Sequence, residues 1–356
     1  MNQQRLQKVL DNMKQAGLRQ LLVTETEPVY YLTGIWVSPM ERMMALYIRE
    51  DGKVTFFGNK LFAIAPQEGL EMVEHTDSDD PVAQLAAAVL PGELGIDETW
   101  PSRFLIGLMS HRPDVKPVLG SEPVAQATMY KDEEERKLMR AASRIDDACI
   151  DMAIHAIREG ITEKELSSKV EHFFQEKGCD HLGFSIVAMG ANGADPHHGT
   201  DGTVLKEGDS IVMDIGAPFN HYWCDMTRTV FYKSASEEQR TVYETVRRAN
   251  EAAIAVVKPG VAFKEIDLAA RKVIEDAGYG EYFTHRTGHS IGMKEHEQPP
   301  VSSECEVIAK PGMIFSIEPG IYLPGKFGVR VEDLVLVTED GCEVLNKYPK
   351  DLIVVE

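Results

Sequence analysis

Five residues in the C-terminal half of the chain have the chemistry and the surroundings of metal ligands. They are Asp214, Asp225, His289, Glu318 and Glu332, and each lies in a short apolar segment with the composition of a β-strand. Burying a bare carboxylate is costly, so several buried carboxylates require a compensating cation. Four carboxylates and one imidazole suit a pair of hard divalent ions, and such a pair is typical of hydrolytic sites.

The alternative interpretation is that these acids are structural and are paired with arginines. Arg228 and Arg330 lie close enough in the sequence to neutralise two of the four carboxylates. This pairing would leave the other two carboxylates and His289 unexplained. The sequence therefore favours a metal site.

The order of the predicted elements indicates how the carboxylates come together. Asp214 and Asp225 lie on consecutive predicted strands joined through 218–220, and Glu318 and Glu332 lie on a second pair joined around 324–325. Alternate side chains of a strand share one face, so we expect the two acids of each hairpin to face one another across the ladder.

Each predicted hairpin follows two predicted helices. The helices over 132–158 and from 162 precede the first hairpin, and those over 236–257 and 263–277 precede the second. The starts at Thr162 and Ser236 carry capping boxes. This α-α-β-β order, present twice, predicts an α+β domain with pseudo-twofold symmetry around a shared site.

The N-terminal part of the chain has a different pattern, a helix and strands in alternation. This pattern predicts an α/β domain over residues 1–125, followed after a change in composition at 130–136 by a catalytic domain over 126–356. The predicted N-terminal elements are a helix over 3–16, strands over 20–24, 43–48 and 53–57, and a helix over 81–90.

Overall composition excludes several functional classes. The net charge of -20 and the pI near 5.0 leave no basic surface for nucleic acid or anionic membranes. The five cysteines are scattered and lack CxxC spacing, which argues against a disulfide framework or a structural zinc site. Because the sequence starts without an export signal and has no bilayer-spanning stretch, we expect a cytoplasmic protein.

Five ordered motifs resemble those of the pita-bread metallopeptidases. The motifs are Asp214-Ile-Gly, Asp225-Met-Thr-Arg-Thr, Gly288-His289-Ser-Ile-Gly, Ser316-Ile-Glu318-Pro-Gly and Val329-Arg-Val-Glu332-Asp. That group includes prolidase (Xaa-Pro dipeptidase), aminopeptidase P, methionine aminopeptidase and creatinase. The segment Tyr30-Tyr-Leu-Thr-Gly34 is similar to one in the N-terminal domain of creatinase, prolidase and aminopeptidase P, which methionine aminopeptidases usually lack. The resemblance therefore implies a pita-bread catalytic domain preceded by a creatinase-like N-terminal domain.

The resemblance also implies a site with two divalent metal ions. Asp214 would hold one ion, His289 and Glu318 the other, and Asp225 and Glu332 would bridge both. The oxygen-rich ligand set favours Mn²⁺, with Co²⁺ or Zn²⁺ as alternatives. A hydroxide between the ions would attack the scissile carbonyl, and Glu318 would accept the proton of the water.

Three further histidines and one arginine match positions of the family. The resemblance implies catalytic roles for His197, His285 and His296 in holding the oxyanion and delivering a proton, with His197 and His296 also binding substrate. It implies that Arg330 orients or neutralises a metal ligand. His181, His198 and His221 are expected to be structural.

The implied activity is that of a metal-dependent exopeptidase cutting the Xaa-Pro bond of dipeptides or short peptides. One alternative is an aminopeptidase P, which releases the N-terminal residue from longer Xaa-Pro peptides. A remote alternative is a non-peptidase binding member of the fold. Some prolidases carry an arginine where this chain has Pro299-Pro300, whereas the short length of the chain favours a dipeptidase. The resemblance also implies a homodimer.

Overall fold

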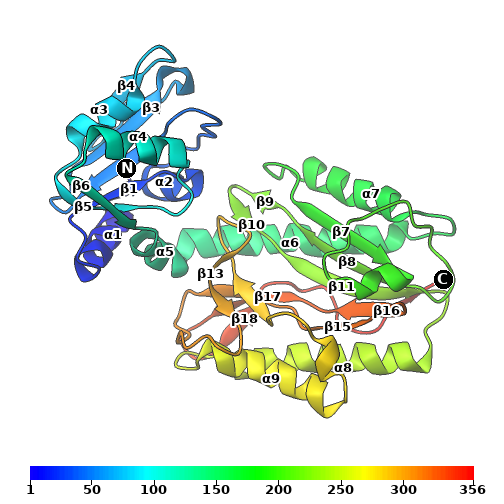
Figure 1. Cartoon of the computed structure of the whole chain (residues 1–356). Helices are drawn as coiled ribbons and strands as arrows, with labels where there is room; N and C mark the ends of the chain where they lie inside the picture. Colours follow the sequence, from blue (N-terminus) through cyan, green and yellow to red (C-terminus); the bar gives the residue numbers. More distant parts are fainter. The chain divides into compact units, whose positions relative to one another are not determined.

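The computed structural model describes residues 1–356, and these fall into two compact units, Met1–Thr128 and Met129–Glu356 (Figure 1). The boundary predicted from the sequence lies between residues 125 and 126. No helix in either unit combines the length and the apolar character required to cross a membrane.

The N-terminal unit is built on one six-stranded sheet with the order β4-β3-β2-β1-β5-β6. Strand β2 is antiparallel to both of its neighbours, and the other pairs are parallel. Helices pack on the sheet around a core that includes Leu22, Phe57, Leu85 and Leu108. The elements are α1 (Gln3–Gln15), β1 (Gln20–Val23), α2 (Thr26–Thr33), β2 (Ala45–Arg49), β3 (Val54–Asn59), β4 (Glu71–His75), α3 (Pro81–Ala88), β5 (Gly92–Ile96), α4 (Ser102–His111), β6 (Val115–Leu119) and α5 (Glu122–Met129).

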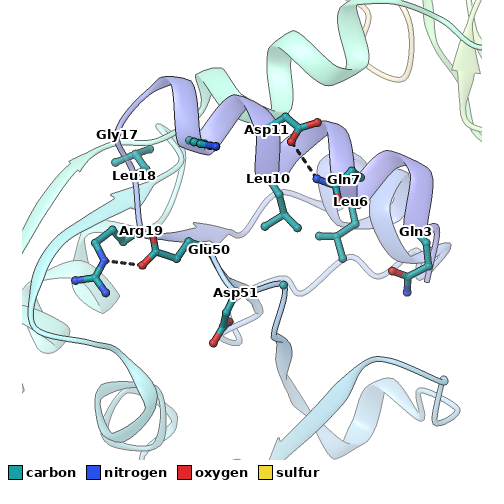
Figure 2. Close-up of a pocket in the computed structure, with 12 residues that line it drawn as sticks. Gln3, Leu6, Gln7, Leu10, Asp11, Gly17, Leu18, Arg19, Glu50 and Asp51 are labelled. Carbon is teal, nitrogen blue, oxygen red and sulfur yellow. Dashed lines mark hydrogen bonds and ion pairs between the residues drawn. The ribbon is translucent and has the colours of Figure 1, made fainter.

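A groove of about 630 Å³ lies on this unit between α1 and the β2–β3 turn (Figure 2). Arg19 and Glu50 form an exposed ion pair of 2.6 Å in it, and Gln7 donates to Asp11 at 3.0 Å. The apolar lining consists of Leu6, Leu10 and Leu18. No histidine or cysteine lines the groove, so it offers no candidate for the predicted chemistry.

The C-terminal unit contains four long helices, and three of them begin at a capping box. Asp132, Thr162 and Ser236 form capping boxes, in which the side chain accepts from the backbone N–H three residues on. The helices are α6 (Glu133–Ala156), α7 (Glu163–Glu176), α8 (Glu237–Val256) and α9 (Phe263–Asp276). These helices agree with the predicted ones to within a few residues.

Two sheets lie between the helix pairs. The first has the order β19-β11-β8-β7 and shares a core with α6 and α7, and the second has the order β13-β12-β14-β17-β18 and shares a core with α8 and α9 (Figure 1). The repeated helix-helix-sheet plan therefore places two similar halves face to face. The strands are β7 (Phe184–Met189), β8 (Ser210–Gly216), β9 (Pro218–Phe219), β10 (Tyr222–Trp223), β11 (Met226–Tyr232), β12 (Gly288–Ser290), β13 (Glu297–Val301), β14 (Ile314–Ile317), β15 (Gly320–Leu323), β16 (Phe327–Arg330), β17 (Asp333–Val337), β18 (Cys342–Val344) and β19 (Val354–Val355).

Candidate metal centre

All five predicted ligands line one cavity of about 440 Å³ in the C-terminal unit. The same cavity is lined by the three predicted catalytic histidines and by Arg330. The remaining lining residues are Phe184, Ile186, Pro196, Arg286 and Glu295. Residues from both halves of the repeat thus meet in one place.

The prediction that the acids face one another across two hairpins is wrong in detail. Only Asp214 lies inside a strand, and its partner across the β8–β11 ladder is Thr227 rather than Asp225. Asp225 precedes β11, Glu318 follows β14, and Glu332 lies between β16 and β17. The physical reason is a change of pairing partner. The chain leaves the β14–β17 ladder after Ile317, forms the separate β15–β16 hairpin, and returns at Asp333.

Glu318 and Glu332 are held at these strand ends by backbone hydrogen bonds. The amide of Glu318 donates to the Thr287 carbonyl at 2.8 Å, and the amide of Glu332 donates to the Thr227 carbonyl at 3.1 Å. The second bond connects the two halves of the repeat. These two backbone hydrogen bonds therefore fix the positions of Glu318 and Glu332 at the strand ends.

The side chain of His289 faces two of the carboxylates with a nitrogen lone pair. Its Nδ1 lies 3.1 Å from the Ser290 carbonyl oxygen, which can only accept, so the proton is on Nδ1 and the Nε2 lone pair is free. Nε2 lies 3.5 Å from Asp225 Oδ2 and 3.5 Å from Glu318 Oε1. The ligand atoms of Asp225, His289 and Glu332 all lie within 4.8 Å of one another. The ligand atoms of Asp225, His289 and Glu332 are therefore acceptors that lie around one small volume.

The backbone beside His289 requires glycine for steric reasons. A Cβ added at Gly288 would collide with the Ser316 carbonyl oxygen on β14. The close approach of β12 to β14 brings His289 beside Glu318.

The carboxylates are strongly perturbed by burial and by one another. Burial raises the pKa of Asp225 well above the usual range, and the charge of Glu332 raises it further. Burial likewise raises the pKa of Glu332, followed by the charge of Glu318. Burial raises the pKa of Glu318 to about 7 even though Arg330 opposes the shift. Burial lowers the pKa of His289 to about 3.

The side chain of Asp214 has the character of a metal ligand. Its Oδ2 accepts from Arg330 Nη2 at 2.6 Å, whereas its Oδ1 is buried and has no hydrogen-bond partner. A buried carboxylate oxygen without a partner is costly. Together with the lone pair of His289, this donor set fits divalent metal ions.

These shifts predict how pH affects the metal-free protein. Above the ordinary histidine pKa of 6.5, His289 is neutral in both the folded and unfolded states, so only the carboxyl shifts remain. Carboxyl groups with raised folded-state pKa values contribute stability at low pH that is lost as pH rises through those values. The Tm of the metal-free protein should therefore fall as pH rises from about 6.5 through the Glu318 pKa of about 7 and beyond it, where Asp225 and Glu332 ionise.

Bound metal should reverse this trend, because the ions require ionised ligands. The difference in Tm between metal-loaded and metal-free protein, followed by differential scanning fluorimetry, should widen over the same pH range. A constant difference would contradict the assignment of these carboxylates as ligands.

Polar side chains surround the carboxylates and orient them. Thr227 Oγ1 donates to Glu332 Oε2 at 2.7 Å, and Ser316 Oγ lies 3.3 Å from Glu318 Oε1. Arg330 is 3% exposed and, besides Asp214, donates from Nε to Thr227 Oγ1 at 3.0 Å. The guanidinium of Arg330 therefore donates its hydrogen bonds to Asp214 and to Thr227, which itself contacts Glu332.

The three predicted catalytic histidines take different positions in the cavity wall. His285 donates from Nδ1 to the Arg286 carbonyl at 2.7 Å, so its Nε2 accepts from the Tyr322 hydroxyl at 2.8 Å. Burial lowers the pKa of His285 to about 4, which keeps it neutral at ordinary pH. The His296 ring lies 3.9 Å from the His289 ring, and both His296 and His197 are exposed to the cavity.

The other histidines lie outside the cavity. His198 is 2.8 Å from Glu163, whose buried carboxylate also accepts from the amides of Met189 and Asp201. His221 lies 3.4 Å from Asp180, and His181 packs edge-on against Trp223.

Several cavity residues were not predicted from the sequence. Phe184 and Ile186 alternate on β7, and that period-two spacing next to Asp214 on β8 was an available signal. Tyr322 joins His285 to Arg330, from which it accepts at 2.9 Å. Arg286 and Glu295 adjoin predicted histidines in the sequence, but no local pattern distinguishes them from surface charges.

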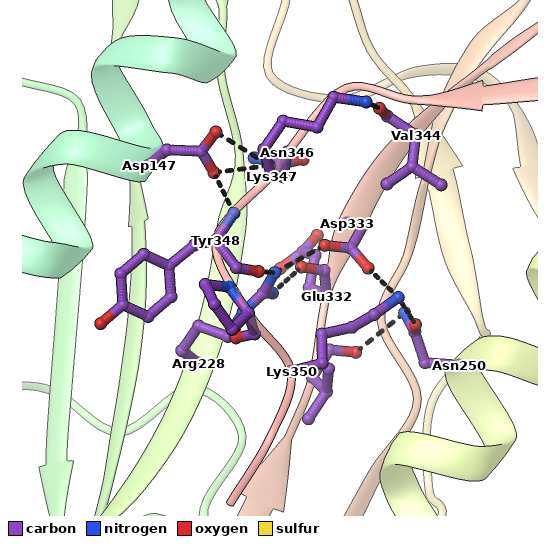
Figure 3. A network of polar contacts seen from close by, with 12 residues as sticks. Asp147, Arg228, Asn250, Glu332, Asp333, Val344, Asn346, Lys347, Tyr348 and Lys350 are labelled. Atoms are coloured by element: carbon purple, nitrogen blue, oxygen red, sulfur yellow. Dashed lines mark hydrogen bonds and ion pairs between the residues drawn. The ribbon is translucent and has the colours of Figure 1, made fainter. Parts of the chain in front are cut away.

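A buried polar network ties the C-terminal segment to the back of the site (Figure 3). Arg228 is 2% exposed and donates to Asp333 Oδ1 at 2.7 Å, to the Glu332 carbonyl at 2.5 Å and to the Tyr348 carbonyl at 2.8 Å. Lys350 donates to Asp333 Oδ2 at 2.7 Å. Burial alone would raise the pKa of Asp333, but Arg228 and Lys350 hold it below its usual range.

The chain matches known proteins over nearly its whole length. Residues 137–339 match the model of metallopeptidase family M24, and residues 5–128 match the creatinase/prolidase N-terminal domain. The crystal structure of a dipeptidase from Pyrococcus horikoshii OT3 has a TM-score of 0.94 and 35% identity, covering 98% of this chain and 99% of that chain. A prolidase from Thermococcus sibiricus has a TM-score of 0.94 and 34% identity, covering 99% of each chain.

A third solved structure has a different named activity. An X-Pro aminopeptidase from Thermotoga maritima MSB8 has a TM-score of 0.83 and 29% identity, covering 97% of this chain and 100% of that chain. All these similarities extend across both units. The family matches, together with the cavity of carboxylates and histidines, show that the chain belongs to metallopeptidase family M24, with a creatinase/prolidase N-terminal domain.

Proposed function

We propose that the protein is a metal-dependent dipeptidase that hydrolyses the bond before proline in Xaa-Pro dipeptides. The observation that carries the proposal is the meeting of four carboxylates, His289 and three further histidines in one cavity. Structures named as dipeptidase and prolidase, each with a TM-score of 0.94, support the substrate class.

The proposed site holds two divalent ions, with Mn²⁺ as the first choice. Asp214, Asp225, His289, Glu318 and Glu332 would hold these ions. When bound, such ions supply an activated water and polarise the scissile carbonyl. The hard oxygen-rich ligand set favours Mn²⁺ over metals that prefer sulfur ligands.

The residues of the chain supply proton transfer and orientation. Glu318, whose pKa is raised by burial to about 7, is suited to accept a proton at ordinary pH. His285 is neutral and fixed by Tyr322, and His197 and His296 are open to the cavity. Phe184 and Ile186 form an apolar wall that suits a proline ring.

Replacing His296 by alanine is expected to lower kcat for Ala-Pro by about 10²-fold or more, because a positioned proton-transfer group is removed. The side chain is exposed, so the fold should be unchanged. Steady-state kinetics and circular dichroism would check both expectations, and His172→Ala, an exposed histidine on α7, is the matched control. An unchanged kcat would remove His296 from the mechanism.

Substrate length distinguishes the dipeptidase from an aminopeptidase P. We expect cleavage of Ala-Pro to exceed that of Ala-Pro-Ala in the presence of Mn²⁺, measured by the release of alanine. Exclusive cleavage of the tripeptide would favour the aminopeptidase. If neither Ala-Pro nor Ala-Pro-Ala is cleaved with Mn²⁺, Co²⁺ or Zn²⁺, both peptidase assignments are contradicted.

The family resemblance also predicts a homodimer, with a cytoplasmic location. Light scattering should then give twice the chain mass of 39.7 kDa.

A further inference from the structure

We propose that Glu163 is a positioning residue for the reaction, although it lies outside the cavity. Its carboxylate holds residues 189–201, the His197 segment, and thereby places His197 in the cavity wall. The Glu163 side chain is fully buried at the first position of α7, whereas His197 is exposed and lines the cavity. This inference rests on the proposed function, in which His197 contacts the substrate.

Four N–H groups of the His197 segment donate to this one buried carboxylate. Its Oε1 accepts from the Met189 amide at 2.7 Å and from Asn192 Nδ2 at 2.9 Å. Its Oε2 accepts from His198 Nε2 at 2.8 Å and from the Asp201 amide at 3.0 Å. The donors lie on both sides of His197 in the sequence. A single carboxylate therefore sets the path of the chain through His197.

The same cluster contains the residue types of a metal site, so that alternative has to be weighed. The ligand atoms of Glu163, His198 and Asp201 lie within 4.8 Å of one another. However, each Glu163 oxygen already accepts two hydrogen bonds, and the N-terminus of α7 is a favourable place for a negative charge. This carboxylate needs no cation, in contrast to Asp214, whose buried Oδ1 has no partner.

Further hydrogen bonds connect the His197 segment to the start of α7 and to the metal centre. The Lys164 amide on α7 donates to the Asp201 carbonyl at 3.1 Å. Arg330 Nη1, in the cavity wall, donates to the Pro196 carbonyl at 3.3 Å, directly before His197. The segment is therefore held both by α7 and by an arginine that contacts Asp214.

Glu163→Gln should disturb this arrangement with little change in side-chain size. The substitution turns one acceptor oxygen into an NH₂ donor, so in either orientation two N–H groups of the segment face a donor. A displacement of about 1 Å in a group that contacts the substrate can cost about 10²-fold in rate. We therefore expect kcat/KM for Ala-Pro to fall by about 10-fold to 10²-fold.

A double-mutant cycle in the Mn²⁺-loaded full chain tests whether Glu163 acts through His197. Glu163→Gln, His197→Ala and the double variant are compared by steady-state hydrolysis of Ala-Pro. The double variant should be within about twofold of His197→Ala, because the positioned group is already gone. Glu176→Gln is the matched control, since Glu176 also lies on α7 and faces a histidine, His172, at 3.2 Å, but is exposed.

A second variant serves if circular dichroism shows that Glu163→Gln does not fold. His198→Ala removes one of the four donors and leaves the carboxylate in place. It should lower kcat/KM for Ala-Pro by about threefold or more, and this loss should also disappear in the His197→Ala background.

The outcomes separate the positioning role from the proposed function. Losses that add in the double variants would show that Glu163 supports the fold without acting through His197. Unchanged activity in Glu163→Gln, or in His197→Ala, would likewise overturn the positioning role while the dipeptidase assignment stands. Failure of the unmodified chain to cleave Ala-Pro would overturn both.

Discussion

Asp225→Asn is expected to lower Ala-Pro hydrolysis at saturating Mn²⁺ by at least about 10³-fold. Asp225 would be one of the ligands that hold the ions, and the amide that replaces it is a neutral and poorer ligand. The side chain is buried, and its carboxylate lies 3.5 Å from His289 Nε2. Asparagine has nearly the same shape, so the loss should come from metal binding rather than from packing.

The same substitution should have the opposite effect on the metal-free protein. Burial and the charge of Glu332 raise the pKa of Asp225, so its ionised form destabilises the fold when no cation is present. At about pH 8, above the Glu318 pKa of about 7, metal-free Asp225→Asn should unfold at the same Tm as the parent protein or above it. Asp276→Asn, at an exposed position on α9, serves as the matched control for both measurements. Activity within tenfold of the parent would contradict the assignment of Asp225 as a metal ligand.

Arg228→Met should destabilise the C-terminal unit by about 3–5 kcal/mol, because it leaves a buried charge without its partner. The guanidinium holds Asp333 Oδ1 at 2.7 Å and the carbonyl oxygens of Glu332 and Tyr348 at 2.5 and 2.8 Å (Figure 3). Methionine fills much of the volume but donates no hydrogen bond. Asp333 would then retain only Lys350 as a cationic partner.

Urea unfolding of metal-free protein would measure this loss. Arg240→Met is the matched control, because Arg240 is exposed on α8 and donates only to the Ala235 carbonyl at 3.2 Å. A loss below about 1 kcal/mol, as expected of a surface pair, would show that the network does not hold the C-terminal segment.

Local signals predicted much of this fold. The helix starts at Thr162 and Ser236 follow from capping boxes, which involve residues only three apart. The apolar runs of the strands and the twofold repeat are likewise visible along the chain. The candidate ligands stand out because acids within apolar segments are unusual, and they do line one cavity.

Long-range pairing was not predictable in the same way. The placement of Glu318 and Glu332 at strand ends depends on the chain leaving one ladder and rejoining it, with Ile317 opposite Asp333. Arg286 and Tyr322 became visible as site residues only when the cavity was formed. Tyr322 joins His285 to Arg330, and Arg286 lines the cavity of the candidate ligands, and both placements arise only in the folded structure.

Titrating Mn²⁺ into chelator-stripped protein while following Ala-Pro hydrolysis tests the central assignment most directly. The carboxylates, His289 and the unpaired Asp214 oxygen predict that activity is absent without metal and rises to a plateau near two equivalents of Mn²⁺ per chain. Full activity in the stripped protein, with no response to added Mn²⁺, Co²⁺ or Zn²⁺, would contradict it.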